Sequence, residues 1–335
     1  METIQATMRE EAARVLAEGR AQVVVGFEEG TLPLTAAPVF ITTPEDAQRL
    51  VWNPACGQNL AKYVHDQVMA HRESQKRLKP QDRKRKVVAV VAPGCTTRSL
   101  AIHLNERQYE RDEVVVLGVP CTGAVDRRKL LAAAGAEELA GGAFGNGTVK
   151  VETAAGIREL ATADLLAESC ASCAFNNPVF SDVMLGEPAP SHDAGREFAP
   201  VEAVQKLSAD ERWQGFAAEM AKCMRCNACR NACPSCYCRV CFAEQSQPQW
   251  VGIGQSGSDV QVFQFMRLYH MAGRCVDCGT CSAVCPMGVD LRRYLKKLDK
   301  DVLDLFGRRA GLSPDEPAVL AEAKEDDPEE FIYSP

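Results

Sequence analysis

The chain has 335 residues, of which 46% are hydrophobic and 25% are charged, enough apolar material to bury a core across about two domains. Its formal net charge of −7 and pI near 5.4 argue against nucleic acid as the main partner. A chain of this size does not need disulfides for stability. We therefore expect its 16 cysteines to be reduced and mostly bound to metal, as in a cytoplasmic protein.

The first segment predicts an amphipathic helix over residues 4–18. Acidic residues are spread through it, and no apolar run leads to a small-residue cleavage site, so it does not resemble a signal peptide. No stretch of the chain approaches the roughly 18 consecutive apolar residues of a membrane span. We expect a cytoplasmic protein with no membrane span.

A short apolar run at residues 23–25 predicts the first strand of the chain. Thr43, Pro44 and Asp46 then form the pattern of an N-cap, an N1 proline and an N3 acid. They predict a helix that carries residues 50–71.

Two units of strand, cysteine-containing loop and helix follow in tandem. The unbroken apolar run at residues 87–93 is typical of a buried parallel strand, and residues 114–120 repeat it. The loop PGCTTRS follows the first strand and CTGAVD follows the second, each leading into a helix. The repeat predicts an α/β domain with a mostly parallel sheet. Functional groups gather at the carboxyl ends of such strands, so Cys95 and Cys121 are expected to converge.

A composition rich in Gly, Ala, Pro and Asp predicts a linker from Gly186 to about Pro200. We therefore divide the chain into an α/β domain at 1–200, a mainly helical domain at 201–312 and an acidic tail at 313–335. The glycine-rich GGAFGNG at residues 141–147 predicts a surface turn.

The strongest motif is C-x2-C-x2-C-x3-C-P, which occurs twice in the C-terminal half. Its first copy comprises Cys223, Cys226, Cys229 and Cys233 before Pro234, and its second comprises Cys275, Cys278, Cys281 and Cys285 before Pro286. This spacing lets a tight loop wrap three corners of a [4Fe-4S] cluster, while the fourth ligand comes from elsewhere. In two-cluster proteins the fourth cysteine ligates the other cluster.

That rule predicts two crossed ligand sets. The first cluster is assigned to Cys223, Cys226, Cys229 and Cys285, and the second to Cys275, Cys278, Cys281 and Cys233. Structural zinc sites instead use cysteine pairs a dozen or more residues apart, without the repeated Cys-Pro ending. Apolar residues recur at helical spacing in 259–274 and 289–306, which favours the α-helical kind of two-cluster ferredoxin.

Eight cysteines remain outside these motifs. Five lie in the N-terminal domain and are candidates for a third [4Fe-4S] site, although any one of them could be a buried spectator thiol: Cys56, Cys95, Cys121, Cys170 and Cys173. Another three follow the first motif and either help to ligate a further cluster or pack beside the neighbouring one: Cys236, Cys238 and Cys241. The sequence predicts at least three clusters and leaves a fourth open.

The loop PGCTTRS, the segment GVPC, the segment CASCAFNNPVFSDVMLG and the motif CMRCNACRNACPSCYCRVCF together resemble the β-subunit family of deazaflavin-reducing hydrogenases and formate dehydrogenases. The similarity runs from about Trp52 to Leu303 and is strongest to bacterial members that accompany heterodisulfide-reductase-type complexes. It implies an electron-transfer subunit whose α/β domain carries FAD and an additional [4Fe-4S] cluster. The family's Pro-Cys loop falls on Pro120 and Cys121, and its C-x2-C motif falls on Cys170 and Cys173.

No G-x-G-x-x-G turn lies between a strand and a helix, so the FAD rests on the resemblance. A pyrophosphate has candidate partners in one strand-end loop, where an ordinary helix cap is the alternative explanation: Thr96, Thr97, Arg98 and Ser99. A basic run forms either a solvated loop or a docking patch for an acidic partner such as ferredoxin: Lys76, Arg77, Lys79, Arg83, Lys84, Arg85 and Lys86.

Nothing in the sequence pairs a nucleophile with a base or two catalytic carboxylates, so no catalytic residue is predicted. Our hypothesis is an iron-sulfur subunit that relays electrons through three or four [4Fe-4S] clusters, to or from a bound FAD. The expected partners are a hydrogenase or formate dehydrogenase catalytic subunit and a heterodisulfide-reductase-type flavoprotein. Two alternatives are a self-contained FAD-dependent reductase of a soluble deazaflavin or nicotinamide, and a scaffold that binds structural zinc.

Overall fold

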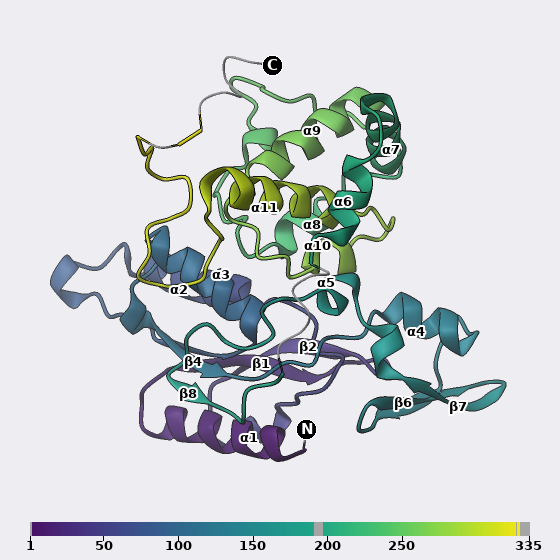
Figure 1. The fold of residues 1–335 in the computed structure, drawn as a ribbon. Helices are drawn as coiled ribbons and strands as arrows, with labels where there is room; N and C mark the ends of the chain where they lie inside the picture. Colours follow the sequence, from purple (N-terminus) through teal and green to yellow (C-terminus); the bar gives the residue numbers. More distant parts are fainter. Residues whose placement is uncertain (1, 191–196, 326, 329–335) are drawn as a thin grey trace.

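A computed structural model describes residues 2–190, 197–325 and 327–328 of the chain. A mixed sheet lies at one end, a helical module at the other, and α2 and α3 lie between them (Figure 1). No helix among the described residues is long and apolar enough to cross a membrane.

The main sheet has five strands in the order β2-β1-β3-β4-β8. Their bounds are β2 Ala36–Ile41, β1 Val23–Glu29, β3 Val88–Ala92, β4 Val114–Gly118 and β8 Val183–Met184. The pairs β1-β3, β3-β4 and β4-β8 are parallel, whereas β2 is an antiparallel edge strand. The register aligns Val25 with Val90, and Val90 with Val116. The predicted mostly parallel sheet is therefore confirmed, with one antiparallel edge.

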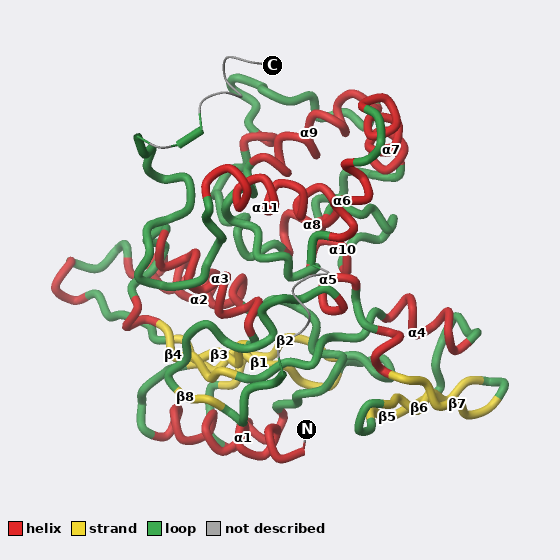
Figure 2. Tube along the Cα trace, in the orientation of Figure 1, coloured by secondary structure: helices red, strands yellow, loops and turns green. Residues whose placement is uncertain are grey.

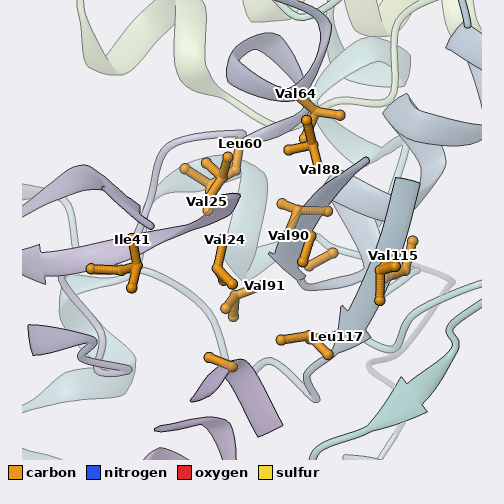
Figure 3. Close-up of a cluster of buried hydrophobic side chains, with 14 of the residues drawn as sticks. Val24, Val25, Ile41, Leu60, Val64, Val88, Val90, Val91, Val115 and Leu117 are labelled. Carbon is orange, nitrogen blue, oxygen red and sulfur yellow. The ribbon is translucent and has the colours of Figure 1, made fainter. Parts of the chain in front are cut away.

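Helices cover both faces of this sheet, which explains why every residue of β3 and β4 is buried. α1 (Glu2–Ala17) packs on one face, while α2 (Ala61–Gln75) and α3 (Gly94–Asn105) pack on the other (Figure 2). The core consists mainly of valine, leucine and isoleucine side chains on the strands and the facing helices (Figure 3). Branched side chains favour strands and fill such a core densely.

The predicted helix over residues 50–71 is wrong in its first half. Thr43 and Asp46 do hydrogen-bond, with Thr43 Oγ1 donating to Asp46 Oδ2 at 2.9 Å, but only a 3-10 turn follows, at Glu45–Arg49. A loop containing Pro54 then leads to α2, since a proline lacks the N–H that a helix interior needs.

A small antiparallel sheet, which the sequence analysis missed, stands beside the main one. It contains β5 Gly141–Phe144, β6 Thr148–Thr153 and β7 Gly156–Ala161, in the order β5-β6-β7. Val149 and Val151 of β6 are buried and cluster with Leu130 of α4 (Arg127–Ala134). The GGAFGNG segment is thus mostly strand and not the predicted surface turn, because pairing with β6 outweighs the low strand preference of glycine.

Helices form the regular structure of the described residues after 197. They are α6 Ala199–Gln205, α7 Ala209–Ala221, α8 Ala228–Ala232, α9 Gly257–Tyr269, α10 Thr280–Ala283 and α11 Arg292–Phe306. The Ser208 side chain caps α7, and Glu211 completes a capping box with it. The predicted helical C-terminal region is confirmed. Part of the predicted linker, residues 191–196, lies outside the described residues.

After α11 the chain returns to the α/β part. Arg98 on α3 donates from Nε and Nη2 to the carbonyl oxygen of Ala310, at 3.1 and 2.8 Å. Asn105 at the other end of α3 donates to the carbonyl oxygens of Ser313 and Pro314, each at 3.1 Å. The beginning of the predicted acidic tail is therefore packed along α3.

Candidate metal centres

The two cysteine motifs adopt the same backbone conformation. In the first motif Arg225 and Asn227 have positive φ angles of 54° and 62°, and in the second Asp277 and Gly279 have φ angles of 57° and 74°. Positive φ is rare outside glycine, so its recurrence at matching positions marks a shared local geometry. The turn directs the Arg225 N–H toward Cys223 Sγ at 3.3 Å, and the Asp277 N–H toward Cys275 Sγ at 3.4 Å.

One cavity brings together four cysteines from both motifs. Its cysteine lining is the set predicted for the first cluster, called here the first cysteine set: Cys223, Cys226, Cys229 and Cys285. Cys285 comes from the second motif, and the Val289 N–H donates to its Sγ at 3.3 Å. The Gln264 side chain donates to Cys223 Sγ at the same distance, 3.3 Å. Cys226 is the exposed member of the set.

The second cysteine set is the one predicted for the second cluster: Cys275, Cys278, Cys281 and Cys233. Burial raises the pKa of the Cys281 thiol to about 12, and the nearby thiols of Cys278 and Cys233 act in the same direction. Cys233, from the first motif, therefore lies near Cys278 and Cys281 of the second motif. Its Sγ also lies 3.8 Å from Met271 Sδ.

The third cysteine set surrounds a cavity between the sheet and the helical module. Its members are Cys95, Cys121, Cys170 and Cys173, and Cys278 of the second set also lines this cavity. Cys95 lies at the start of α3, directly after β3, and Cys121 follows β4. The two strand-end cysteines thus come together, as their positions after adjacent parallel strands predict.

Hydrogen bonds hold the segment after Cys170 and Cys173 against the loops that follow β3 and β4. The Cys121 N–H donates to the Asn176 carbonyl at 3.0 Å, and the Val179 N–H donates to Thr97 Oγ1 at 3.1 Å. Gly94 allows the close approach, because a Cβ there would collide with the Phe175 and Asn177 carbonyl oxygens. Only glycine accommodates this contact without displacing the segment.

Burial raises the pKa of every thiol in the third set. The pKa of Cys121 rises to about 12, that of Cys95 rises well above its ordinary value, and those of Cys170 and Cys173 rise as well. Buried thiols of this kind stay protonated unless a cation replaces the protons. Their convergence therefore fits metal binding coupled to proton release.

Cys56 lies apart from this cavity. It is 8% exposed in the hydrophobic core, where its thiol donates to the Val51 carbonyl at 3.7 Å. Burial raises its pKa to about 12. Of the five candidates, the structure therefore brings all except Cys56 to the cavity.

The three remaining cysteines have different surroundings. Cys236 lies beside Cys233, Cys238 is exposed, and Cys241 packs against the small cluster around Phe263. None of them lines the two cavities described above.

The residues predicted to contact a flavin are buried in this structure. Thr96, Thr97, Arg98 and Ser99 are each at most 3% exposed. The Thr97 hydroxyl donates to the Gly94 carbonyl, and the Ser99 hydroxyl accepts from Asn59 Nδ2. Arg98 Nη2 donates to the Ala310 carbonyl. In the described parts of the chain, only Arg98 of the four bonds to the C-terminal region, whereas Thr97 and Ser99 bond within the α/β part. The four buried side chains therefore do not form an exposed pyrophosphate site in this structure.

Polar groups that the sequence analysis did not single out surround the cysteines. Arg267 on α9 is 6% exposed and donates from Nη2 to the Cys229 carbonyl at 2.8 Å. Its Nε and Nη1 are buried without a hydrogen-bond partner among the described residues. Unsatisfied buried donors are costly, so they fit an anionic group such as a thiolate-ligated cluster. No group of three or more His, Cys, Asp or Glu side chains in the described part is spaced to hold a single metal ion.

Comparison with known proteins agrees with the cysteine geometry. Residues 219–289 match the family model of a 4Fe-4S dicluster domain, a range that contains both motifs. The chain is 28% identical over 110 residues to the F420-dependent formate dehydrogenase subunit beta of Methanocaldococcus jannaschii. It is 34% identical over 116 residues to the F420-dependent formate dehydrogenase 1 subunit beta of Methanococcus maripaludis.

These similarities cover only part of each protein. The matches span 33% and 35% of this chain, and 28% of the length of each relative. Among solved structures, the F420-reducing [NiFe] hydrogenase complex from Methanosarcina barkeri contains a chain with a TM-score of 0.38 and 14% identity. That alignment covers 65% of this chain and 86% of the other. The chain is thus an iron-sulfur protein related in part to formate dehydrogenase beta subunits.

Proposed function

We propose that this protein is the electron-transfer subunit of a multi-subunit redox complex and binds three [4Fe-4S] clusters. The observation that carries the proposal is the crossed first set, in which Cys285 of the second motif shares a cavity with Cys223, Cys226 and Cys229 of the first. Crossing of this kind is the ligation rule of two-cluster ferredoxins. When bound, each cluster supplies one-electron redox chemistry.

The protein's own residues have two tasks at these sites. Twelve thiolates would hold the iron, as grouped in the first, second and third sets. Backbone N–H groups of Arg225, Asp277, Gly123 and Val289 donate to cysteine sulfurs, which stabilises their anionic form. Cys229, Cys281 and Cys285 are buried, whereas Cys226 is exposed and the other eight are partly exposed.

The third cysteine set is proposed as the ligand set of an additional cluster in the α/β part. Support comes from the four converging thiols and from Cys278, which lines the same cavity and belongs to the second set. Because Cys278 belongs to the second set and lines the cavity of the third, the two sites are adjacent. Electron exchange between two clusters requires such proximity. We place Cys236, Cys238 and Cys241 outside the three sets and propose no fourth cluster.

The partners are proposed from the partial relatives and from charge. A formate dehydrogenase or hydrogenase catalytic subunit and a heterodisulfide-reductase-type flavoprotein are the candidates, in a cytoplasmic complex. The basic run between α2 and β3 is a candidate surface for an acidic partner such as ferredoxin. Six of its seven cationic residues are exposed, namely Lys76, Arg77, Lys79, Arg83, Lys84 and Arg85. Binding there would weaken as salt screens the charges.

Iron, sulfide and flavin content per chain after anaerobic purification tests the proposal. We expect about 12 irons and about 12 sulfides, four of each per cluster, with reduced-cluster signals in electron paramagnetic resonance (EPR) after dithionite. About eight irons would confine metal to the helical module. Stoichiometric FAD with turnover of a soluble deazaflavin or nicotinamide would support the self-contained reductase instead. Zinc without iron would refute both readings.

A further inference from the structure

A single guanidinium group joins two of the cysteine loops. Arg292, at the start of α11, donates from Nε to Asp277 Oδ1 at 2.5 Å and from Nη2 to Asp277 Oδ2 at 2.8 Å. Its Nη2 also donates to Ser172 Oγ at 2.7 Å. Asp277 lies between Cys275 and Cys278 of the second set, and Ser172 lies between Cys170 and Cys173 of the third. Arg292 therefore connects the loop of one set to the loop of the other.

This connection is buried and depends on the shape of the arginine. The side chains of Arg292 and Asp277 are 11% and 9% exposed, so water screens their interaction only weakly. The planar fork of arginine binds both carboxylate oxygens and still has a donor for the hydroxyl. Lysine would keep the charge but not this fixed arrangement of donors. Asp277 is held further by Lys296, whose Nζ lies 3.3 Å from Oδ2.

The two ends of the ion pair act on the cysteines with opposite sign. Arg292 brings a positive charge to the Cys170–Cys173 loop through its contact with Ser172. Asp277 carries a negative charge within the Cys275–Cys278 loop. A nearby cation favours the more negative, reduced form of a redox group, and a nearby anion disfavours it.

We propose that Arg292 is a positioning residue that fixes the second and third cysteine sets relative to one another and raises the reduction potentials of the clusters they bind. The inference rests on the cluster sites proposed above. The spacing of the cysteines alone does not predict a role for the contact between Asp277, Arg292 and Ser172.

The test is an EPR-monitored redox titration of the purified full-length protein. Arg292→Gln is expected to shift the midpoint potentials of the second and third clusters to more negative values, whereas Asp277→Asn shifts them to more positive values. Opposite shifts follow from charge, because simple loosening of the loops would move both variants in the same direction. Shifts in the same direction, or no shift, would overturn the electrostatic role.

Two further variants test the positional role. Arg292→Lys keeps the charge and loses the fork, so its potentials should stay closer to wild type than those of Arg292→Gln. The spin coupling between the two reduced clusters should be weaker in the Arg292→Lys protein than in wild type. It should also be weaker in the Ser172→Ala protein, which loses only the link to the third set. Unchanged spin coupling in both variants would contradict the positional role. These milder variants also keep the test valid if Arg292→Gln loses iron.

The matched control is Arg72→Gln. Arg72 on α2 pairs with the buried Glu113, Nη2 to Oε2 at 2.5 Å, and neither residue lies on or next to a cysteine loop. Its removal should leave both potentials and the spin coupling unchanged. Wild-type iron content separates the two proposals: about eight irons would refute the third cluster, whereas about 12 irons with unresponsive potentials would refute the role of Arg292 alone.

Discussion

His103 on α3 donates a hydrogen bond from Nε2 to the carbonyl oxygen of Pro234, which directly follows the cluster ligand candidate Cys233, at 2.8 Å. Since a carbonyl only accepts, Nδ1 is the acceptor for the Tyr109 hydroxyl, 3.1 Å away. Both ring nitrogens are thus satisfied in the neutral imidazole. Burial lowers the pKa of His103 to about 3.

This pKa predicts a pH dependence of stability. The unfolded chain binds a proton at His103 below about pH 6.5 while the folded chain does not, so the free energy of unfolding falls as pH decreases from about 6.5 toward 3. The His103 contribution to the slope approaches about 1.4 kcal/mol per pH unit. His103→Gln should remove that contribution, and should cost about 1–3 kcal/mol at pH 7.5 through the lost hydrogen bonds.

Anaerobic urea unfolding followed by tryptophan fluorescence, between pH 5 and 7.5, measures both effects. His71→Gln is the control, because His71 lies near the surface and its ring Nε2 bonds to the Lys84 carbonyl at 2.9 Å. A wild-type slope in the His103 variant would show that another group controls the acid sensitivity.

Paired cysteine substitutions should reveal the crossed ligand sets. Cys223→Ser with Cys285→Ser removes two ligands of one set, so we expect a loss of about four irons. Cys223→Ser with Cys233→Ser removes one ligand from each of two sets, and we expect a larger loss of up to about eight irons. The measurement is iron per chain together with EPR. If Cys223 and Cys233 instead share a cluster, the second pair will cost no more iron than the first.

The third site is tested by Cys121→Ala against Cys56→Ala. The first variant should lose about four irons, since Cys121 lines the cavity. The second should retain wild-type iron and lose stability only, by about 1–2 kcal/mol, because Cys56 is a packed core thiol. If only the Cys56 variant lost iron, Cys56 would be the cluster ligand and Cys121 the packed thiol.

A methyl group at Gly94 should damage the third site without changing any thiol. Gly94→Ala would push away the Phe175 carbonyl, at a cost of about 1–3 kcal/mol, and displace the segment that carries Cys173. The iron lost should belong to the third cluster alone. Gly215→Ala is the matched control, because its Cβ meets nothing within 4 Å on α7 and alanine favours a helix by up to about 1 kcal/mol. Equal iron content in the two variants would argue against a site beside Gly94.

Much of the fold follows from local patterns. The valine runs of β3 and β4 are continuous because both faces of the sheet are covered, and that pattern predicts parallel strands. Because β3 and β4 are parallel neighbours, the residues after their carboxyl ends lie at the same edge of the sheet. Cys95 and Cys121 therefore line one cavity, as predicted. The strand β5 was missed because its glycines indicate a turn, and only its pairing with β6 makes it a strand.

Other features depend on contacts between distant residues. The hydroxyl-rich start of α3 has the composition of an anion site, yet it is buried in the folded chain. No local pattern of Thr96 or Arg98 predicts this burial. The bond from Arg292 to Ser172 spans 120 residues and carries no spacing signal. Periodicity and motif spacing report on neighbours along the chain, so such contacts appear only in the folded structure.

The return of the chain after α11 has a mechanical consequence. The helical module is attached to the α/β part where the chain enters before α6, and again where Ala310 and Ser313 bond to α3. A body held at two ends cannot swing about a single hinge. We therefore expect the two parts to move as one rigid body that keeps the three cysteine sets at a fixed spacing.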